Sequence, residues 1–316
     1  MAYTSATAAG TQLSAAIMEV YSQEVLFSAQ PFMLFEQFVT RREELGKQPG
    51  QTINFLRYNS LSGSDSLTEL TDMTINAITG SQVQISVAEH GFAVGMTQLL
   101  RDVSFDDVLS SAAKLLGMHM GKSRDALIRD VFYGFSNVAY AGGKTGRASL
   151  LATDTFSVDL VREGVEQLAV NKCPKIGNEY ICIIHPRQAK NLRKDKDWVN
   201  ASNYGAPGQL FTGELGRIDD VRFLQTTQIR RILSTDGSIY TDNADTGVNA
   251  GTYSSNTDVY SAVLLGDYAV GLAVAREAEL RDNGVTDFGR KQELAYYGLW
   301  GAGIVESGHA VILESA

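Results

Sequence analysis

The chain has 316 residues, of which 44% are hydrophobic and 20% charged, so it can build a substantial core in one discontinuous domain or two intimate ones. Its 27 Lys and Arg against 36 Asp and Glu give a formal net charge of −9, which argues against a large nucleic-acid-gripping surface. The first forty residues contain no Lys or Arg, and the longest apolar run, 262–275, is interrupted by Asp267. We therefore expect neither a secretory signal nor a membrane span, synthesis in a cytoplasm, and reduced, buried thiols at Cys173 and Cys182.

The N-terminal part of the chain has the character of an arm. Residues 1–12 are mostly Ala, Thr, Ser and Gly with little to bury, and apolar residues then recur at helical spacing over 13–25. After Pro31 comes an aromatic cluster with more apolar surface than a short terminal segment can cover by itself, so it must pack on the chain's own core or on a neighbour. Its members are Phe32, Phe35 and Phe38.

A long hairpin is predicted after the arm. Apolar and polar residues alternate over 51–58 and 73–87, and the link at 59–71 is rich in Ser, Gly and Asp. Two strands bury too little apolar area to be stable alone in water, so we expect the hairpin to lie on another surface. The candidate intersubunit contacts are the three aromatic residues above together with apolar residues of this hairpin: Ile53, Phe55, Val83, Ile85 and Val87.

Apolar residues at helical spacing over 105–135 predict a helix of about 45 Å. Ser104 is the expected N-cap, and acidic residues follow where the helix dipole favours them. Gly117 and Gly121 lie one turn apart, which predicts that another backbone passes close to the helix. The expected buried stripe is Phe105, Val108, Leu109, Ala112, Leu116, Leu127, Val131 and Phe135.

The second half of the chain alternates between helical and extended patterns. Apolar spacing over 160–168 predicts a helix that Asp154 or Thr155 would cap. A buried strand is expected over 180–184, and Pro186 suits the first turn of a helix that follows it. Further strands are expected at 218–224, 259–265, 269–275, 294–300 and 310–313. The last two would close a sheet on the long helix.

The motifs that resemble catalytic or binding sites are incomplete. Residues 142–145 resemble the end of a phosphate-binding loop, but Val138 stands where the opening glycine belongs. Ser111 and Lys114 fit a Ser-x-x-Lys pattern, but the spacing to the Lys-Thr-Gly at 144–146 is too short for penicillin-binding enzymes. None of the four histidines has a second His or a Cys at metal-ligand spacing in its own segment, but residues from different segments could still meet in the folded chain to form a metal site. The histidines are His90, His119, His185 and His309. The sequence predicts no catalytic residue, no cofactor and no metal site.

The order of parts and several stretches of sequence resemble the major capsid proteins of tailed bacteriophages. The most telling stretches are Tyr-Ile-Cys-Ile-Ile-His-Pro at 180–186, Asn-Leu-Arg at 191–193, Gly-Glu-Leu-Gly-Arg-Ile at 213–218 and Val-Arg-Phe at 221–223. The order of the predicted elements is similar over nearly the whole chain, whereas similarity of the amino-acid sequence itself is confined to residues near 90–225 and the C-terminus.

The resemblance implies an α+β fold, the tailed-phage major capsid fold. It would comprise an N-terminal arm at 1–48, an extended β-hairpin loop at 49–100, a peripheral domain at 101–150 and 277–316 with the long helix as its spine, and an axial α/β domain at 151–276. Encapsulins share this fold, so the fold alone does not separate a viral shell from a bacterial compartment. The sequence stretches quoted above favour a phage capsid protein over an encapsulin-like shell protein, and nothing in the sequence supports a hydrolase.

The implied function is structural rather than enzymatic. Copies of the chain would form hexamers and pentamers that close into an icosahedral shell around packaged double-stranded DNA, without sequence-specific DNA contacts and without a membrane. The implied partners are a separate scaffolding protein, a portal and a decoration protein, and the implied location is the virion capsid after assembly in the host cytoplasm. Some relatives crosslink this loop through Lys, but residues 51–99 contain none, which argues against such a crosslink.

Overall fold

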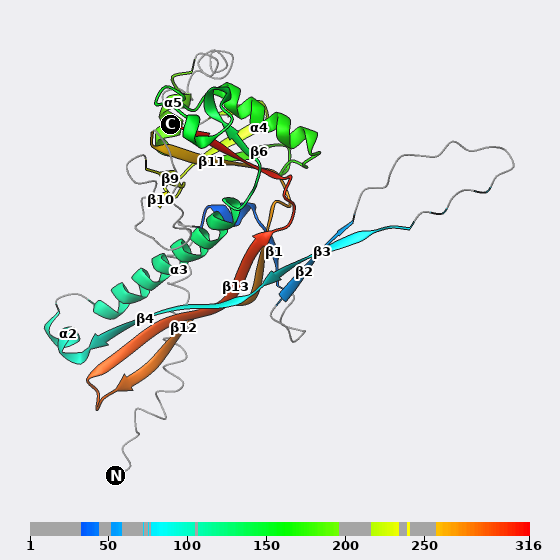
Figure 1. Cartoon of the computed structure of the whole chain (residues 1–316). Coiled ribbons are helices and arrows are strands. Elements are labelled where there is room, and N and C mark those ends of the chain that lie inside the picture. Colours follow the sequence, from blue (N-terminus) through cyan, green and yellow to red (C-terminus); the bar gives the residue numbers. More distant parts are fainter. Residues whose placement is uncertain are drawn as a thin grey trace, which may run out of the picture.

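The structure is a computed structural model that describes residues 33–43, 52–58, 72, 75, 77–104, 107–195, 216–233, 239–240 and 257–316. Its strands form three sheets, and one long helix, α3, runs from the far end of the smaller multistranded sheet to the larger one (Figure 1). A two-stranded hairpin, β2–β3, projects to the side of this body (Figure 1). The expected mixed α+β fold is confirmed.

The long helix begins later than expected because a separate short helix precedes it. Helix α2 (Gln98–Val103) is capped at its N-terminus by the Thr97 side chain, and Ser104 is its C-cap residue. Helix α3 (Val108–Phe132) is capped by Asp107, whose Oδ1 accepts hydrogen bonds from two backbone N–H groups at 3.1 and 3.4 Å. Ser104 was therefore the wrong cap: its own N–H closes α2, and the Asp107 carboxylate satisfies the free amides of α3.

Helix α3 lies on a four-stranded sheet with the order β1-β12-β13-β4. Strand β1 runs parallel to β12, and the other pairs are antiparallel. The strands are β1 (Thr40–Arg42), β12 (Val270–Thr286), β13 (Lys291–Ile304) and β4 (Ala88–Thr97). Strands β4 and β13 pair over ten residues, so β4 belongs to this sheet rather than to the hairpin loop in which the expected boundary at 100 placed it.

The buried stripe of α3 follows the expected one only in part, and the expected Val108 and Leu109 at its start are partly buried. Ala112, Leu116 and Phe135 are buried as expected, and Gly117 and Gly121 are buried as well. Further along, Ile128 and Phe132 are fully buried, whereas the expected Leu127 and Val131 are only partly covered. Phe105 lies outside the described residues. The stripe shifts by one residue because Arg124, Asp125 and Arg129 are buried among the apolar side chains.

An eight-stranded sheet forms the other half of the body. Helices α4 (Val158–Val170) and α5 (Pro186–Leu192) pack on one face, and the other face contributes to the core under α3. Helix α4 is capped by Ser157 rather than by Asp154 or Thr155. The strands are β5 (Val138–Tyr140), β6 (Tyr180–Ile184), β7 (Arg217–Ile218), β8 (Val221–Gln225), β9 (Arg231–Ile232), β10 (Ile239–Tyr240), β11 (Val259–Leu265) and β14 (Ala310–Ser315).

The expected domain boundaries cut across these sheets. Strand β14, expected in the same unit as the long helix, pairs with β11 in the eight-stranded sheet. Strand β12 crosses the boundary at 276 without interruption. The last strand runs antiparallel to β11 over six residue pairs and parallel to β5, which fixes its register from both sides. The C-terminus therefore lies beside α5 in the upper part of Figure 1.

Candidate assembly surfaces

The hairpin is anchored at its base to the chain's own four-stranded sheet. Strands β2 (Thr52–Tyr58) and β3 (Gly80–Ser86) pair in the expected antiparallel register. Ile53, Phe55 and Ile85 point to one side and pack on Ala273, each at most 3% exposed. Three of the candidate intersubunit contacts are thus covered by their own chain.

A floor of small residues on the sheet makes this packing possible. Gly271 pairs with Gly303, and Ala273 pairs with Gly301, so the four residues lie together on one face of β12 and β13; we call them the glycine seat. A Cβ atom at Gly271 would lie 2.6 Å from Cζ of Phe55, and one at Gly301 would lie 2.0 Å from a backbone oxygen of β3. The seat was missed in the sequence, although glycines two apart on a strand share a face and could have signalled it.

Polar contacts hold the hairpin base from the sides. Arg57 forms an ion pair with Glu306 at 2.6 Å, and the guanidinium of Arg42 in β1 lies 5.0 Å from the ring centre of Phe55. Val83 and Val87 are partly buried at the margin of this cluster. The base is therefore fixed on several sides.

The distal part of the hairpin exposes apolar side chains to solvent. Leu56 is 50% exposed, Tyr58 68% and Ile78 72%. Leu56 and Tyr58 lie at the end of β2 and Ile78 lies just before β3, so all three belong to the part of the hairpin beyond the glycine seat. This hairpin projects from the body in Figure 1. An apolar surface of this kind on a projecting strand pair has no partner within the described part of the chain.

The N-terminal arm is attached through Phe35, which is fully buried in the main core. Phe35 belongs to the short 3-10 helix η2 (Phe35–Phe38), and its ring centre lies 5.9 Å from that of Phe132 in α3. Phe38 is partly buried against the same core. Phe35, a candidate intersubunit contact, is thus also covered by its own chain, and Phe32 lies outside the described residues.

A buried carboxylate on α3 binds the backbone of this attachment. Oδ1 of Asp125 accepts hydrogen bonds from the backbone N–H groups of Phe35 at 2.7 Å and Glu36 at 3.4 Å. Burial raises the pKa of Asp125 to about 7, although the two hydrogen bonds and Arg129 oppose the shift and Glu36 adds to it. The carboxyl group can therefore take up a proton near neutral pH.

A charged network lies next to it. The guanidinium of Arg124, 3% exposed, forms ion pairs with Glu36 at 2.6 Å and Glu277 at 3.0 Å. The same group lies 5.6 Å from the ring centre of Trp300. Arg41 in β1 also pairs with Glu277. The arm, α3 and β12 are thereby joined by buried and half-buried charges, which are costly to leave unpaired.

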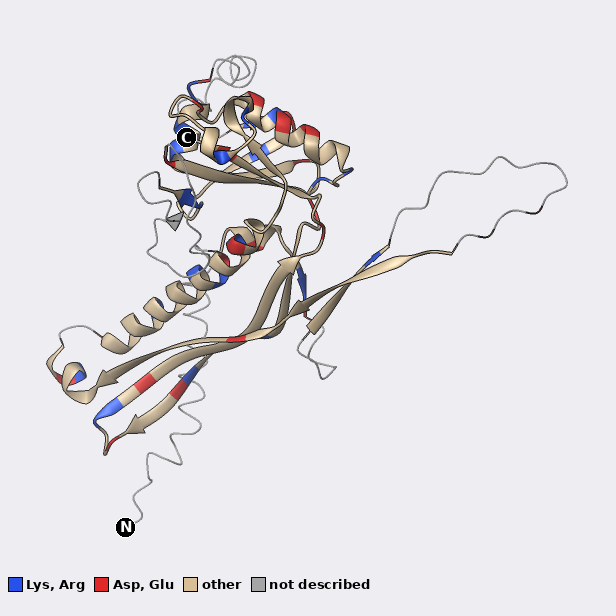
Figure 2. Ribbon diagram, in the orientation of Figure 1, with Lys and Arg blue, Asp and Glu red and all other residues tan. Residues whose placement is uncertain are grey.

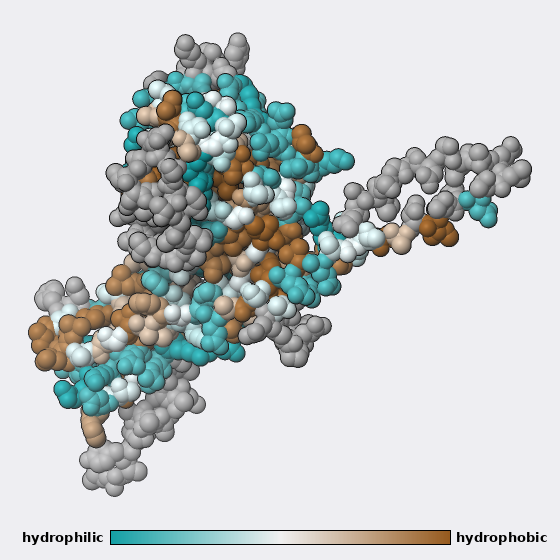
Figure 3. Space-filling model, viewed as in Figure 1, coloured by the Kyte–Doolittle hydropathy of each residue, from teal (hydrophilic) through white to brown (hydrophobic). Residues whose placement is uncertain are grey.

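A second set of exposed apolar residues lies on α2, α3 and β4. Its members are exposed by 48–76%, and Figure 3 shows a hydrophobic patch at this end of the molecule. We call it the tip patch; it consists of Phe92, Leu99, Leu100, Val103 and Leu115. The sequence signal was present, because apolar residues recur in 98–103, but nothing in one sequence says that they stay uncovered.

The described residues contain no group of three or more His, Cys, Asp or Glu side chains that could hold a metal ion. His185, a candidate ligand by residue type, instead accepts a hydrogen bond from the backbone N–H of Arg187 and caps α5. Cys173 and Cys182 are free and buried, as expected, and burial raises the pKa of both thiols. Among the described helices, none has the length and apolar character to cross a membrane.

Comparison with solved structures gives the same fold repeatedly. The capsid of Ralstonia phage GP4 superimposes with a TM-score of 0.69 at 16% identity, covering 88% of this chain and 86% of that one. The capsid of cyanophage P-SCSP1u gives 0.68 at 18% identity, covering 90% and 88%. Cyanophage Pam1 gives 0.68 at 15% identity, covering 88% of each.

A comparison with curated protein sequences gave no significant match. The family model described as phage capsid protein, in contrast, matches residues 33–303, which is most of the chain. Neither an encapsulin-like compartment nor a hydrolase is favoured by these matches. The chain belongs to the phage capsid protein family and is a structural major capsid protein.

Proposed function

We propose that copies of this chain assemble as hexamers and pentamers into an icosahedral shell that encloses packaged double-stranded DNA. The observation that carries the proposal is the hairpin, which is fixed at its base and exposes Leu56, Tyr58 and Ile78 beyond it. A neighbouring copy supplies the surface that covers these side chains. Many such weak contacts, repeated by symmetry, give a stable closed shell.

The tip patch is the best candidate for the surface that receives them. It is apolar, uncovered and far along the molecule from the hairpin (Figures 1 and 3). Burial of apolar area at about 25 cal/mol per Å² favours covering both surfaces at once. Phe38, Val83 and Val87, which are partly buried, would lie at the margins of such contacts.

In this proposal, the arm and the hairpin reach neighbours, α3 with the four-stranded sheet forms the peripheral part, and the eight-stranded sheet forms the axial part of each capsomer. The net charge of −9 favours a shell that encloses DNA without binding its phosphates tightly and without sequence-specific contacts, because strong DNA binding needs an excess of Lys and Arg. A separate scaffolding protein, a portal and a decoration protein complete the proposed partners. The shell is assembled in the host cytoplasm and becomes the virion capsid.

The hairpin provides the direct test. Deleting residues 59–71 should leave a soluble, folded subunit that does not close shells, as seen by sedimentation velocity and electron microscopy. Leu56→Ser with Tyr58→Ser should have the same effect because the distal apolar surface is lost. Gln82→Ser, an exposed polar change on the partner strand, is the matched control and should leave shells intact. Normal shells from the deletion variant would contradict the proposed role of the hairpin.

A further inference from the structure

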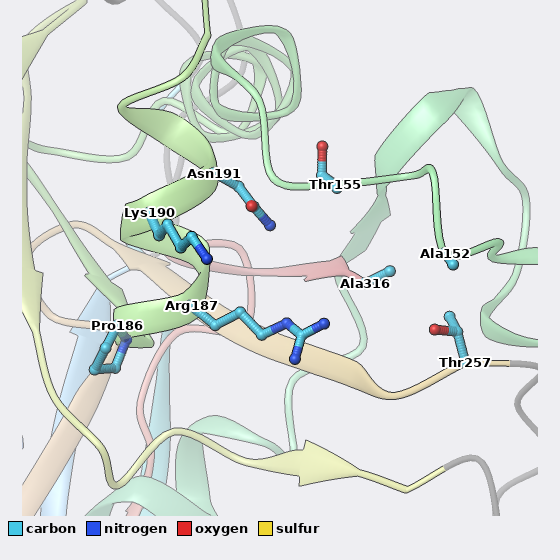
Figure 4. Close-up of a pocket in the computed structure, with 8 residues that line it drawn as sticks. All are labelled: Ala152, Thr155, Pro186, Arg187, Lys190, Asn191, Thr257 and Ala316. Carbon is cyan, nitrogen blue, oxygen red and sulfur yellow. The ribbon is translucent and has the colours of Figure 1, made fainter.

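A cavity of about 540 Å³ opens beside α5 in the eight-stranded half of the molecule. Figure 4 shows the side chains of Arg187, Lys190 and Asn191 projecting from α5 into it, with Thr155 and Ala316 on other sides. Both cationic side chains belong to exposed residues. The cavity is open to solvent and suited to a negatively charged group.

Arg187 and Lys190 have no ion-pair partner among the residues that the structure describes. The guanidinium of Arg187 lies 5.7 Å from the ring centre of Tyr260. Arg193 and Lys194 follow at the end of the same helix. Arg187 and Lys190 are therefore the cations that line this cavity, although the whole chain is acidic.

Helix α4 presents the opposite charge. Glu163 and Glu166 are exposed one turn apart and have no ion-pair partner among the described residues, whereas Asp159 pairs with Arg162. The two glutamates line a second hollow of about 490 Å³. Figure 2 shows several acidic residues along α4 and basic residues near α5 and the C-terminus, with basic residues also on and around α4.

We propose that Glu163 and Glu166 of one copy dock against Arg187 and Lys190 of the next copy around each capsomer ring. A ring is built from heterologous contacts, in which one side of every subunit meets the other side of its neighbour. Opposite charges on two sides of one chain satisfy that geometry, and they also set the direction in which copies join. This inference rests on the proposed assembly into rings.

The ligand of the basic cavity is a second copy rather than a phosphate because the same chain supplies the complementary acids. Two carboxylates one helical turn apart match two cations that are three residues apart on a helix, since both pairs span about one turn. A phosphate ligand would leave the unpaired acids of α4 unexplained.

Charge reversal tests the pairing. Glu163→Lys with Glu166→Lys makes both faces basic, and Arg187→Glu with Lys190→Glu makes both acidic. Each variant should fold, because all four residues are exposed, and each should lower the yield of closed particles at least about tenfold through like-charge contact. The charge-conserving pair Arg187→Lys and Lys190→Arg is the control and should assemble. The chain with all four reversals has the original net charge and should form closed shells again.

Co-expression of the two reversed chains makes a sharper test, because rings of alternating chains have only complementary contacts. A six-membered ring can alternate fully, but a five-membered ring must contain one like-charged contact. The mixture should therefore give six-fold rings, visible by negative-stain microscopy, without five-fold rings or closed shells.

Closed shells from either reversed chain alone, at the yield of the unchanged chain, would overturn the inference, and so would failure of the four-reversal chain to assemble. Binding of inorganic polyphosphate by the unchanged chain, lost in Arg187→Glu with Lys190→Glu and accompanied by no rescue in the four-reversal chain, would replace the second copy by a phosphate ligand. If the unchanged chain itself forms no particles, the proposed function fails first, and that result is distinct from all of these.

Discussion

The packing of the hairpin on the glycine seat yields a sharp prediction for Gly271→Ala. The new Cβ atom would lie 2.6 and 2.8 Å from Cζ and Cε1 of Phe55 and 2.9 Å from a methyl carbon of Val305. Such distances are well inside van der Waals contact, and the ring has little room to move because Phe55 is only 3% exposed. The hairpin base must therefore shift away from the sheet.

Overpacking a buried contact typically costs about 1–3 kcal/mol, and in Gly271→Ala this penalty applies to the docked state of the hairpin. A cost near the middle of this range, about 2 kcal/mol, would raise the equilibrium population of undocked hairpin by about 30-fold. The main core is on the opposite face of the sheet, where Leu272 and Trp300 pack under α3, so the subunit should remain folded.

Hydrogen exchange measured by mass spectrometry separates these outcomes. Peptides from β2 and β3 should exchange faster in Gly271→Ala, whereas peptides from α3 should not change. Adding Phe55→Leu removes the clashing ring atoms and should restore part of the protection. Gly95→Ala is the matched control, because a Cβ there would meet only Cγ of Glu293 at an ordinary 3.7 Å. If the hydrogen-exchange rates of β2 and β3 are the same in Gly271→Ala as in the unchanged chain, the hairpin base does not depend on the glycine seat.

Three further predictions concern the body of the subunit. Burial raises the folded-state pKa of Asp125 from 3.8 to about 7, so the protonated carboxyl group stabilises the fold below pH 4, and this stabilisation is lost as the pH rises to about 7. The free energy of unfolding should therefore fall by roughly 4 kcal/mol between pH 4 and 8. Asp125→Asn should remove this decrease, as measured by urea unfolding of unassembled subunits. Asp107→Ala should lower the free energy of unfolding by about 1 kcal/mol, and more than Ser104→Ala; the reverse order would contradict the observed cap. The Cys182 thiol should react with a thiol reagent only after unfolding, and fast reaction of the native subunit would show that it is accessible.

Much of the fold follows from periodicity in the sequence, because one-sided burial leaves a regular pattern. The strands β2, β3, β6 and β11 and the long helix were predicted on this basis and are present. The second half of the α3 stripe was misplaced because charged residues are buried there. Hydropathy cannot indicate that Arg124 is paired with Glu36, a residue 88 positions away, or that Asp125 binds the arm backbone.

The candidate contacts show a second limit of the sequence. An alternating strand has two faces, and the pattern does not say which surface each face meets. Ile53, Phe55 and Ile85 were candidates for a neighbour, and the glycine seat of the same chain covers them instead. Exposed apolar residues such as Leu99 and Val103 could be recognised only after folding left them without cover.

In the proposed assembly, this chain is a shell subunit whose projecting hairpin is fixed at its own sheet and covered by a neighbour. Cryo-electron microscopy of particles formed by the purified chain tests it most directly. We expect closed particles with five- and six-fold capsomers, in which Phe55 lies on Gly271 of its own chain and Leu56 and Tyr58 contact another copy. A dispersed monomer at high concentration, or particles in which the distal hairpin contacts only solvent, would contradict it.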